Sequence, residues 1–187
     1  MPDASPSSSL PGSPRGSLAA PTPKPVRVSQ AEMTELVLPN DANTMGNVLG
    51  GKVMHLVDLC GAIAACRHAS RICVTASVDH MDFRHPVTVG ELLILKASVN
   101  RVFTTSMEVG VKVYAESMQD GERRHTSSAY LTFVAVDEHG GRQAVPQVIP
   151  ETDAERRRFE AAGARRAHRL AQRPSQESSA CGGPSSR

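Results

Sequence analysis

Two polar residues whose side chains could take part in catalysis, Asn47 and Asp58, lie before and within a mostly apolar stretch. Asp58 lies among apolar and small residues, where a carboxylate is costly unless it is partnered or functional. Such a carboxylate can act as a general base towards water or as a nucleophile. Asn47 precedes the stretch, and an amide there can position a carbonyl group or a water. The structural alternatives are a hydrogen-bonded or surface Asp, and an Asn that only caps a helix or forms a turn.

Glycines lie close to Asn47 on its C-terminal side, at Gly50 and Gly51. Glycine lets the backbone approach a ligand closely. The start of a helix also offers free N–H groups and the positive end of the helix dipole. The backbone at Gly50 and Gly51 is therefore suited to a carbonyl oxygen or an oxyanion.

The residues from Gly50 to about His68 are predicted to form one long helix. Apolar residues recur there at spacings of three and four, and the second half consists of small residues that allow close packing on a sheet. Alternating apolar residues predict one strand before this helix and four after it, at residues 34–38, 73–83, 91–103, 106–118 and 123–136. This order predicts an α+β fold with an antiparallel sheet that the helix covers on one face.

Composition divides the chain into a domain and two tails. Residues 1–28 and 174–187 are rich in Ser, Pro and Gly and bury too little apolar surface to offset the entropy of ordering, so we expect both to be disordered. We expect the domain at residues 29–149 and a basic helix at 150–173, where Thr152 and Glu155 have capping-box spacing. That helix carries seven arginines, so it is either a solvated surface helix or a binder of a phosphate group.

Charge and residue usage argue against several classes of function. The net charge of the 187 residues is +2, which is too small to indicate a nucleic-acid partner. The chain starts without the apolar core of a signal peptide and has no apolar run near the roughly 20 residues of a membrane span. We therefore expect a cytoplasmic protein. We expect no metal, because His80 and Asp82 share a strand face while His85 lies past the strand end.

Six segments together resemble one known family. They are Leu38–Gly51, Val57–Asp58, Ala65–His68, Val74–Asp79, Phe103–Val109 and Val145–Thr152. In combination they resemble the acyl-CoA hydrolases of the brain acyl-CoA hydrolase type. These are hotdog-fold thioesterases, found as single-domain bacterial chains and as tandem-domain animal enzymes. The resemblance covers about residues 36–159 and implies a sheet wrapped around one long central helix, together with hydrolysis of fatty acyl-CoA to free fatty acid and coenzyme A.

The resemblance also implies a catalytic pair and an assembly. In the tandem enzymes an Asn of one repeat and an Asp of the other serve one site, and the matching positions here are Asn47 and Asp58. Leu49 stands where members often have His, which we interpret as a change in pocket lining. The family implies a homodimer as the minimal unit and a homohexamer built as a trimer of dimers. Helix geometry agrees with a shared site, because 11 helical residues separate the pair by roughly 16 Å.

The substrate implied by the resemblance suggests further contacts. Hydroxyl groups between two strands are suited to the pantetheine arm, although a polar turn is an alternative use for them, and an Arg in the loop after residue 83 is suited to a phosphate. No cofactor is implied other than coenzyme A as part of substrate and product. The residues expected to bind the substrate are Gly50, Gly51, Phe83, Arg84, Thr104 and Ser106.

Two other functions are compatible with the same fold. Hydroxyacyl-CoA dehydratases typically pair a catalytic Asp with a His five residues on, but Gly46 follows Asp41 at that distance and Ile63 follows Asp58. A non-catalytic acyl-CoA-binding protein is the second alternative, and turnover of palmitoyl-CoA discriminates it from a hydrolase.

Overall fold

The computed structural model describes residues 21–172 of the chain. The expected tail at 174–187 and most of the tail at 1–28 lie outside the described residues. The packed chain begins earlier than the expected boundary at residue 28, because Lys24–Pro25 form strand β1 and Val26–Ser29 form a 3-10 helix, η1. Tertiary contacts order this segment: Val26 is buried in the core, and the Ser29 hydroxyl accepts the N–H of Val99 at 2.9 Å.

Five antiparallel strands form the main sheet, in the order β2-β4-β5-β6-β3. The short β1 pairs in parallel with β7 (Val148–Ile149), and a second 3-10 helix, η2, spans Pro39–Asp41. The five predicted strands are confirmed, although the first begins three residues earlier than expected. The strands of the sheet are β2 (Ala31–Leu36), β3 (Ile72–Phe83), β4 (Leu92–Val102), β5 (Ser106–Glu116) and β6 (Arg123–Val136).

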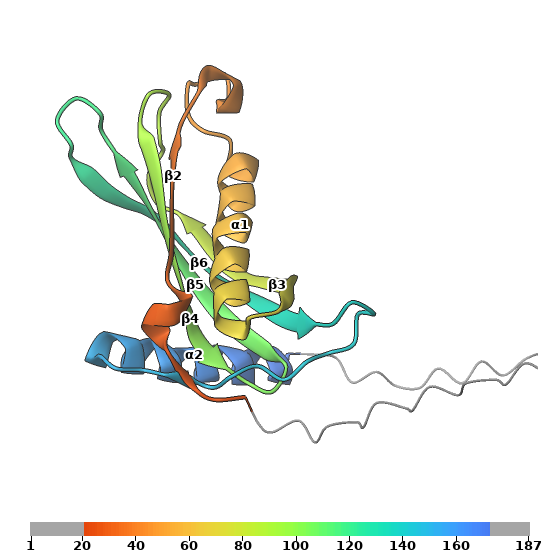
Figure 1. Cartoon of the computed structure of the whole chain (residues 1–187). Coiled ribbons are helices and arrows are strands. Elements are labelled where there is room, and N and C mark those ends of the chain that lie inside the picture. The colour runs from red at the N-terminus through yellow and green to blue at the C-terminus, as the bar shows by residue number, and fades with distance from the viewer. Residues whose placement is uncertain (1–20, 173–187) are drawn as a thin grey trace, which may run out of the picture.

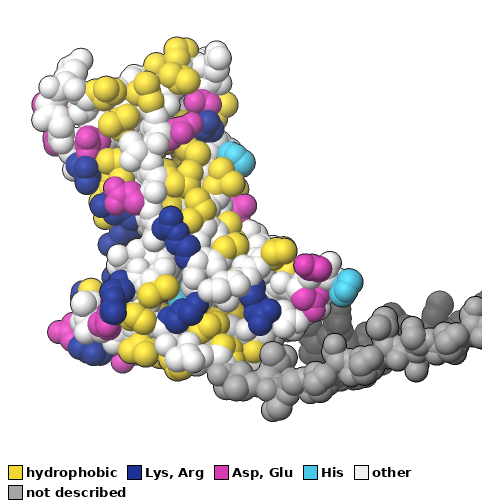
Figure 2. All heavy atoms as spheres, in the orientation of Figure 1, with side chains coloured by type: hydrophobic (Ala, Val, Ile, Leu, Met, Phe, Trp, Pro, Cys, Tyr) yellow, Lys and Arg dark blue, Asp and Glu magenta, His cyan; other side chains and the backbone are white. Residues whose placement is uncertain are grey.

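Helix α1 (Gly50–Ala69) lies across one face of this sheet (Figure 1). It matches the predicted span, and it ends where Ser70 adopts a left-handed backbone conformation with φ of 53°. The side of α1 away from the sheet remains partly apolar, as Figure 2 shows along the middle of the molecule. Met54, Leu59 and Ile63 are the large exposed apolar residues of this side.

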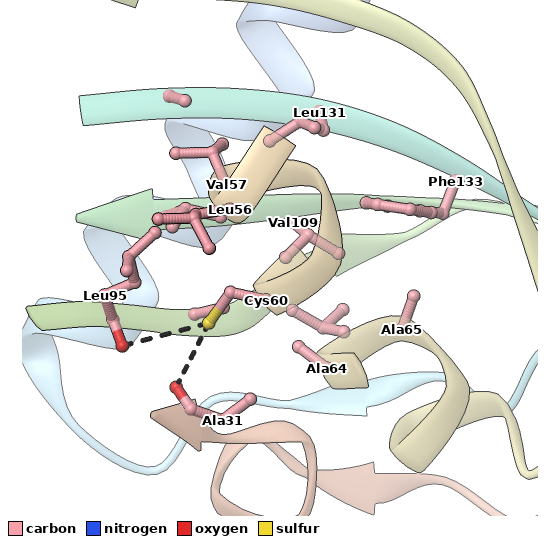
Figure 3. Packing of buried hydrophobic residues seen from close by; sticks show 14 of the residues in the cluster. Ala31, Leu56, Val57, Cys60, Ala64, Ala65, Leu95, Val109, Leu131 and Phe133 are labelled. Atoms are coloured by element: carbon pink, nitrogen blue, oxygen red, sulfur yellow. Dashed lines mark hydrogen bonds between the residues drawn. The ribbon is translucent and has the colours of Figure 1, made fainter. Parts of the chain in front are cut away.

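Small side chains let α1 pack closely on the sheet, as the sequence predicts. A Cβ at Gly61 would lie 3.1 Å from ring atoms of Phe133, so glycine makes this contact possible. Cys60 is buried beside the same layer, with its Sγ 3.9 Å from the carbonyl oxygen of Ala31 and 3.8 Å from that of Leu95 (Figure 3). Burial raises the pKa of the Cys60 thiol to about 11, so this cysteine is a core residue and a poor nucleophile.

Helix α2 (Asp153–Ala171) packs on the opposite face of the sheet, mainly against β4. Its predicted capping box is present, since Thr152 and Glu155 bond to each other's backbone N–H groups. A solvated surface helix was one of the two interpretations of this basic segment, but several of its arginines contact residues of the sheet. Arg165 makes two hydrogen bonds to the carboxylate of Glu108, at 2.6 and 3.0 Å, and Arg169 pairs with Asp79.

No helix within residues 21–172 is long and apolar enough to cross a membrane.

Candidate active site

The loop before α1 folds around the side chain of Asn43. Its Oδ1 accepts the backbone N–H of Met45 at 2.9 Å and that of Asn47 at 3.2 Å. The backbone closes the same turn, because the Asn43 N–H donates to the Asn47 carbonyl at 2.8 Å. Gly46 has a φ of 76°, which glycine adopts without strain. The conformation of Asn47 therefore depends on the amide of Asn43.

A second segment, residues 86–90, holds this loop from the side. Asn47 forms an isolated β-bridge with Thr88, and the N–H of Val48 donates to the carbonyl of Val87 at 2.8 Å. Both the N–H and the hydroxyl of Thr88 bond to Oε2 of Glu91, at 2.7 and 3.0 Å. The loop with Asn47 is thus tied to Glu91 through Thr88.

Arg124 on β6 fixes Glu91 in turn. Its guanidinium makes bonds of 2.6 and 2.7 Å to the two carboxylate oxygens and reaches the carbonyl of Pro86 at 3.1 Å. The bond from Arg124 holds the pKa of Glu91 below its usual value, so the pair stays ionised at neutral pH. We call Arg124, Glu91 and Thr88 the loop clamp.

A cavity of about 310 Å³ opens at the start of α1 beside this loop. Asn43 and Asn47 line it together with Gly50, Phe83 and Arg84. The ring of Phe83 lies 3.6 Å from the position of a Cβ on Gly50, so any side chain there would contact the ring. Within the described residues, the N–H groups of Gly50 and Gly51 have no hydrogen-bond acceptor. They are therefore free to bind an oxygen atom of a ligand.

Asp58 lies in a second cavity, of about 320 Å³, near the middle of α1. The hydroxyl of Thr75 on β3 donates to Oδ1 of Asp58 at 2.6 Å. The sequence suggested a buried carboxylate, but Asp58 is half-buried in the single chain. The rest of the lining is mostly apolar: Met54, Val57, Val78, Met81 and Leu131.

The two residues of the predicted catalytic pair therefore line different cavities, which share no lining residue. Of the expected substrate contacts, Gly50, Phe83 and Arg84 line the cavity of Asn47, and Gly51 lies beside it in the first turn of α1. Thr104 and Ser106 lie at the turn between β4 and β5, near the other end of the sheet. The N–H of Val145 donates to the carbonyl of Thr104 in this turn. One chain does not bring these two hydroxyls to either cavity.

The possible metal ligands near the end of β3 form an ion-pair cluster. Nε2 of His80 lies 3.0 Å from Oδ1 of Asp82, and Arg84 lies 3.8 Å from the other carboxylate oxygen. A cation beside the carboxylate competes with a metal ion for it. Among residues 21–172 no group of three His, Cys, Asp or Glu side chains is arranged to hold a metal.

Comparison with known proteins places the chain in a family. The model of the thioesterase superfamily matches residues 45–122. The uncharacterized acyl-CoA thioester hydrolase YkhA of Bacillus subtilis is 42% identical over 127 residues, which are 68% of this chain and 74% of that protein. The human cytosolic acyl coenzyme A thioester hydrolase is 36% identical over 142 residues, which are 75% of this chain and 37% of the human protein.

Solved structures agree with this placement. A hexameric acyl-CoA thioesterase without ligand superposes with a TM-score of 0.78 at 43% identity, covering 81% of this chain and 99% of that one. The acyl-CoA hydrolase of Staphylococcus aureus, solved with butyryl coenzyme A and coenzyme A, gives 0.75 at 35% identity, with coverage of 79% and 90%. The chain belongs to the acyl-CoA thioester hydrolases of the thioesterase superfamily, and the predicted hotdog fold is confirmed.

Alanine variants of the Staphylococcus aureus enzyme draw attention to two further residues. Structures exist with an Asn, an Asp and a Thr replaced, and 15 residues separate the Asn from the Asp and 17 the Asp from the Thr. In this chain Asn43, Asp58 and Thr75 have the same two spacings, whereas Asn47 precedes Asp58 by 11 residues. Sequence reasoning named Asp58 but neither Asn43 nor Thr75.

Proposed function

We propose that the chain hydrolyses fatty acyl-CoA to a free fatty acid and coenzyme A, with Asp58 at the reacting carbon. The observation that carries this proposal is the Asp58 carboxylate, oriented by the hydroxyl of Thr75 in a mostly apolar cavity. An apolar lining is suited to an acyl chain, and a carboxylate is the group that hydrolysis needs beside it. Coenzyme A enters only as part of substrate and product, and no other cofactor takes part.

The chemistry follows from the position of these groups. Water adds to the thioester carbonyl while Asp58 takes its proton, the C–S bond breaks, and the coenzyme A thiolate leaves and is protonated. In the alternative, Asp58 attacks the carbonyl itself and gives a mixed anhydride, which water then hydrolyses. In both cases the free N–H groups of Gly50 and Gly51 stabilise the developing oxyanion.

We further propose that each site is shared by two copies of the chain. The cavities of Asn47 and Asp58 are separate in one chain, and a two-fold axis that pairs two α1 helices in antiparallel directions would join them. Strand β3 supports this arrangement, because it is an edge strand that exposes Ile72, Val74 and Val78. The homodimer is then the minimal unit, and a trimer of dimers gives a homohexamer like those of solved relatives.

The amide partner of Asp58 is Asn47 or Asn43. Asn47 was predicted as the catalytic residue, and it lines the cavity at the start of α1. Asn43 lines the same cavity and has the spacing of the Asn replaced in the Staphylococcus aureus enzyme. Oδ1 of Asn43 is occupied by two backbone N–H groups, which leaves its NH₂ group as a donor for the thioester oxygen. We propose a cytoplasmic location, in keeping with the cytosolic human relative.

Release of free thiol from palmitoyl-CoA by the purified full chain tests the hydrolase. We expect turnover, and we expect Asp58→Ala to lose most of it while keeping its unfolding temperature. A panel from acetyl- to stearoyl-CoA covers the chain lengths. Binding of every acyl-CoA without thiol release would instead identify a non-catalytic binder, and loss of water from a hydroxyacyl-CoA would identify a dehydratase.

Subunit mixing tests the shared site and the choice of Asn. Asn43→Ala, Asn47→Ala and Asp58→Ala are prepared separately, and Asp58→Ala is then mixed with each Asn variant under conditions that allow subunit exchange. A mixed dimer carries one intact site, so activity should return with whichever Asn variant was inactive alone. No recovery, despite exchange shown by a tagged subunit, would mean that each chain holds its own complete site.

A further inference from the structure

The cavity of Asp58 contains a second titratable side chain beside the carboxylate. His55 lines this cavity of about 320 Å³ together with Asp58. The rest of the lining consists of Thr75 and apolar residues, so β3 and β6 contribute no titratable group to it. Among residues 21–172, His55 and Asp58 are therefore the two titratable groups that line this cavity.

Helix geometry places the imidazole beside the carboxylate. His55 precedes Asp58 by three residues on α1, and residues at this spacing lie on the same side of a helix with Cβ atoms about 5–6 Å apart. Asp58 is half-buried and accepts a hydrogen bond from the hydroxyl of Thr75, whereas His55 is exposed. The carboxylate is thus held in one orientation, while the imidazole remains able to turn towards a substrate in the cavity.

The imidazole of His55 is free of structural contacts. Four other histidines of the described chain each have a polar partner: His68, His80, His125 and His168. Within residues 21–172, His55 has neither an ion pair nor a side-chain hydrogen bond. Both of its ring nitrogens are therefore available for proton transfer.

Thioester hydrolysis moves more than one proton, and Asp58 accounts for only part of this transfer. The carboxylate takes a proton from water, or it attacks the carbonyl and holds no proton at all. Another proton goes to the sulfur of coenzyme A, which is an alkyl thiol like that of cysteine, with a pKa of about 8.5. An imidazolium with the ordinary histidine pKa of about 6.5 transfers its proton to such a thiolate with an equilibrium constant of about 100. A histidine beside the thioester is therefore a suitable donor.

We infer that His55 is the general acid that protonates the coenzyme A sulfur as the C–S bond breaks. The electron pair of that bond goes to the sulfur, the proton passes from a ring nitrogen of His55 to the same atom, and the imidazole is left neutral. In the water route, the proton that Asp58 has taken then returns to His55. In the anhydride route, the neutral imidazole takes a proton from the water that cleaves the anhydride, so both groups end in their starting forms. This inference rests on the proposed hydrolysis, for which it names the proton donor.

Two thioesters of the same fatty acid test the donor, because their leaving thiols differ in the need for a proton. Coenzyme A leaves as a basic alkyl thiolate, whereas 4-nitrothiophenol leaves as a stabilised thiolate that needs no proton. We expect His55→Gln to lower kcat/KM for the acyl-CoA by about tenfold or more, and kcat/KM for the nitrothiophenyl ester by less than about threefold. The ratio kcat/KM is the appropriate quantity, since it includes the steps up to C–S cleavage.

The pH dependence of kcat/KM for the acyl-CoA is the second measurement. The wild type should lose activity as the pH rises through the range in which histidine gives up its proton, because a general acid must be protonated. The profile of His55→Gln should lack this descent. His139→Gln is the matched control, since this exposed histidine lies in the turn after β6 and outside the cavity. It should leave both kcat/KM values and the pH profile unchanged.

Failure of this inference is distinguishable from failure of the hydrolase proposal. A wild type that releases no thiol from any acyl-CoA would refute the hydrolase, and this inference with it. Turnover of acyl-CoA that falls by less than about threefold in His55→Gln would refute the inference alone. An equal loss on both thioesters would also refute it, because His55 would then act before the leaving group departs. A descent at high pH that persists in His55→Gln would assign the donor to another group.

Discussion

Replacing Arg165 by Ala should destabilise the protein strongly, because it leaves a buried carboxylate without its charged partner. Glu108 is 1% exposed, and Arg165 supplies two of its three side-chain hydrogen bonds. Removing one member of a buried ion pair costs about 3–5 kcal/mol. The Arg165 side chain is 26% exposed, and water can enter the space it leaves. We therefore expect the free energy of unfolding to fall by about 2–4 kcal/mol.

Urea unfolding at fixed protein concentration measures this loss, since assembly itself contributes to stability. Arg157→Ala on the same helix is the control and should change the free energy by less than about 0.5 kcal/mol. The double variant Glu108→Met with Arg165→Met should recover part of the loss, because an apolar pair leaves no buried charge while Nδ2 of Asn100 loses its acceptor. A loss below about 1 kcal/mol in Arg165→Ala would refute the reasoning, since it would mean that water reaches Glu108 freely.

Three further predictions concern the loop clamp, a buried histidine and the edge strand. Arg124→Ala should lower kcat markedly and the unfolding temperature only slightly, because Glu91 then no longer fixes the loop of Asn43 and Asn47. Arg123→Ala, which breaks the neighbouring exposed ion pair with Glu116, is the control for both measurements. Burial lowers the pKa of His68 below 6.5, so His68 binds a proton more readily in the unfolded chain than in the folded chain. The free energy of unfolding should therefore fall as the pH drops below about 6.5. His68→Gln should make the free energy of unfolding less dependent on pH in this range. Val74→Lys should place two like charges near a two-fold axis and give an inactive monomer by light scattering, whereas Leu170→Lys, at similar exposure on α2, should not; an active monomer would contradict the shared site.

Periodicity was enough to predict the main elements but not the contacts that order the ends. The apolar spacing over Gly50–Ala69 and the alternation in four long strands come from faces that must be buried, so the sequence carries them directly. Lys24 is different. Its Nζ donates to the carbonyl of His68 at 2.8 Å, 44 residues away, and no local pattern predicts such a bond.

The arginines of α2 illustrate the same limit. Sequence shows that the helix is basic, but whether an Arg is solvated depends on what faces it across the sheet. Glu108 and Asp79 come from β5 and β3, and each looks like an ordinary polar residue of an alternating strand. Only the sheet order β2-β4-β5-β6-β3 places them beneath α2.

For the candidate site, the sequence carries a signal for Asp58 but little for its neighbours. A carboxylate among small apolar residues is conspicuous, whereas Asn43 in a polar loop and Thr75 on a strand resemble ordinary turn and surface residues. Thr75 becomes notable only because β3 brings its hydroxyl to 2.6 Å from Asp58 across 17 residues. Asn43 becomes notable because its side chain organises the turn in which Asn47 lies.

The two cavities also differ in how completely one chain builds them. The cavity with both Asn residues is fixed from within, since the loop clamp ties it to β6 through bonds of 2.6 and 2.7 Å. The cavity of Asp58 lies between α1 and β3, which is an edge strand of the sheet with exposed apolar residues. Association of two chains would bring the Asn residues of one chain to the Asp58 cavity of the other and so complete the set of residues, and activity should therefore depend on assembly.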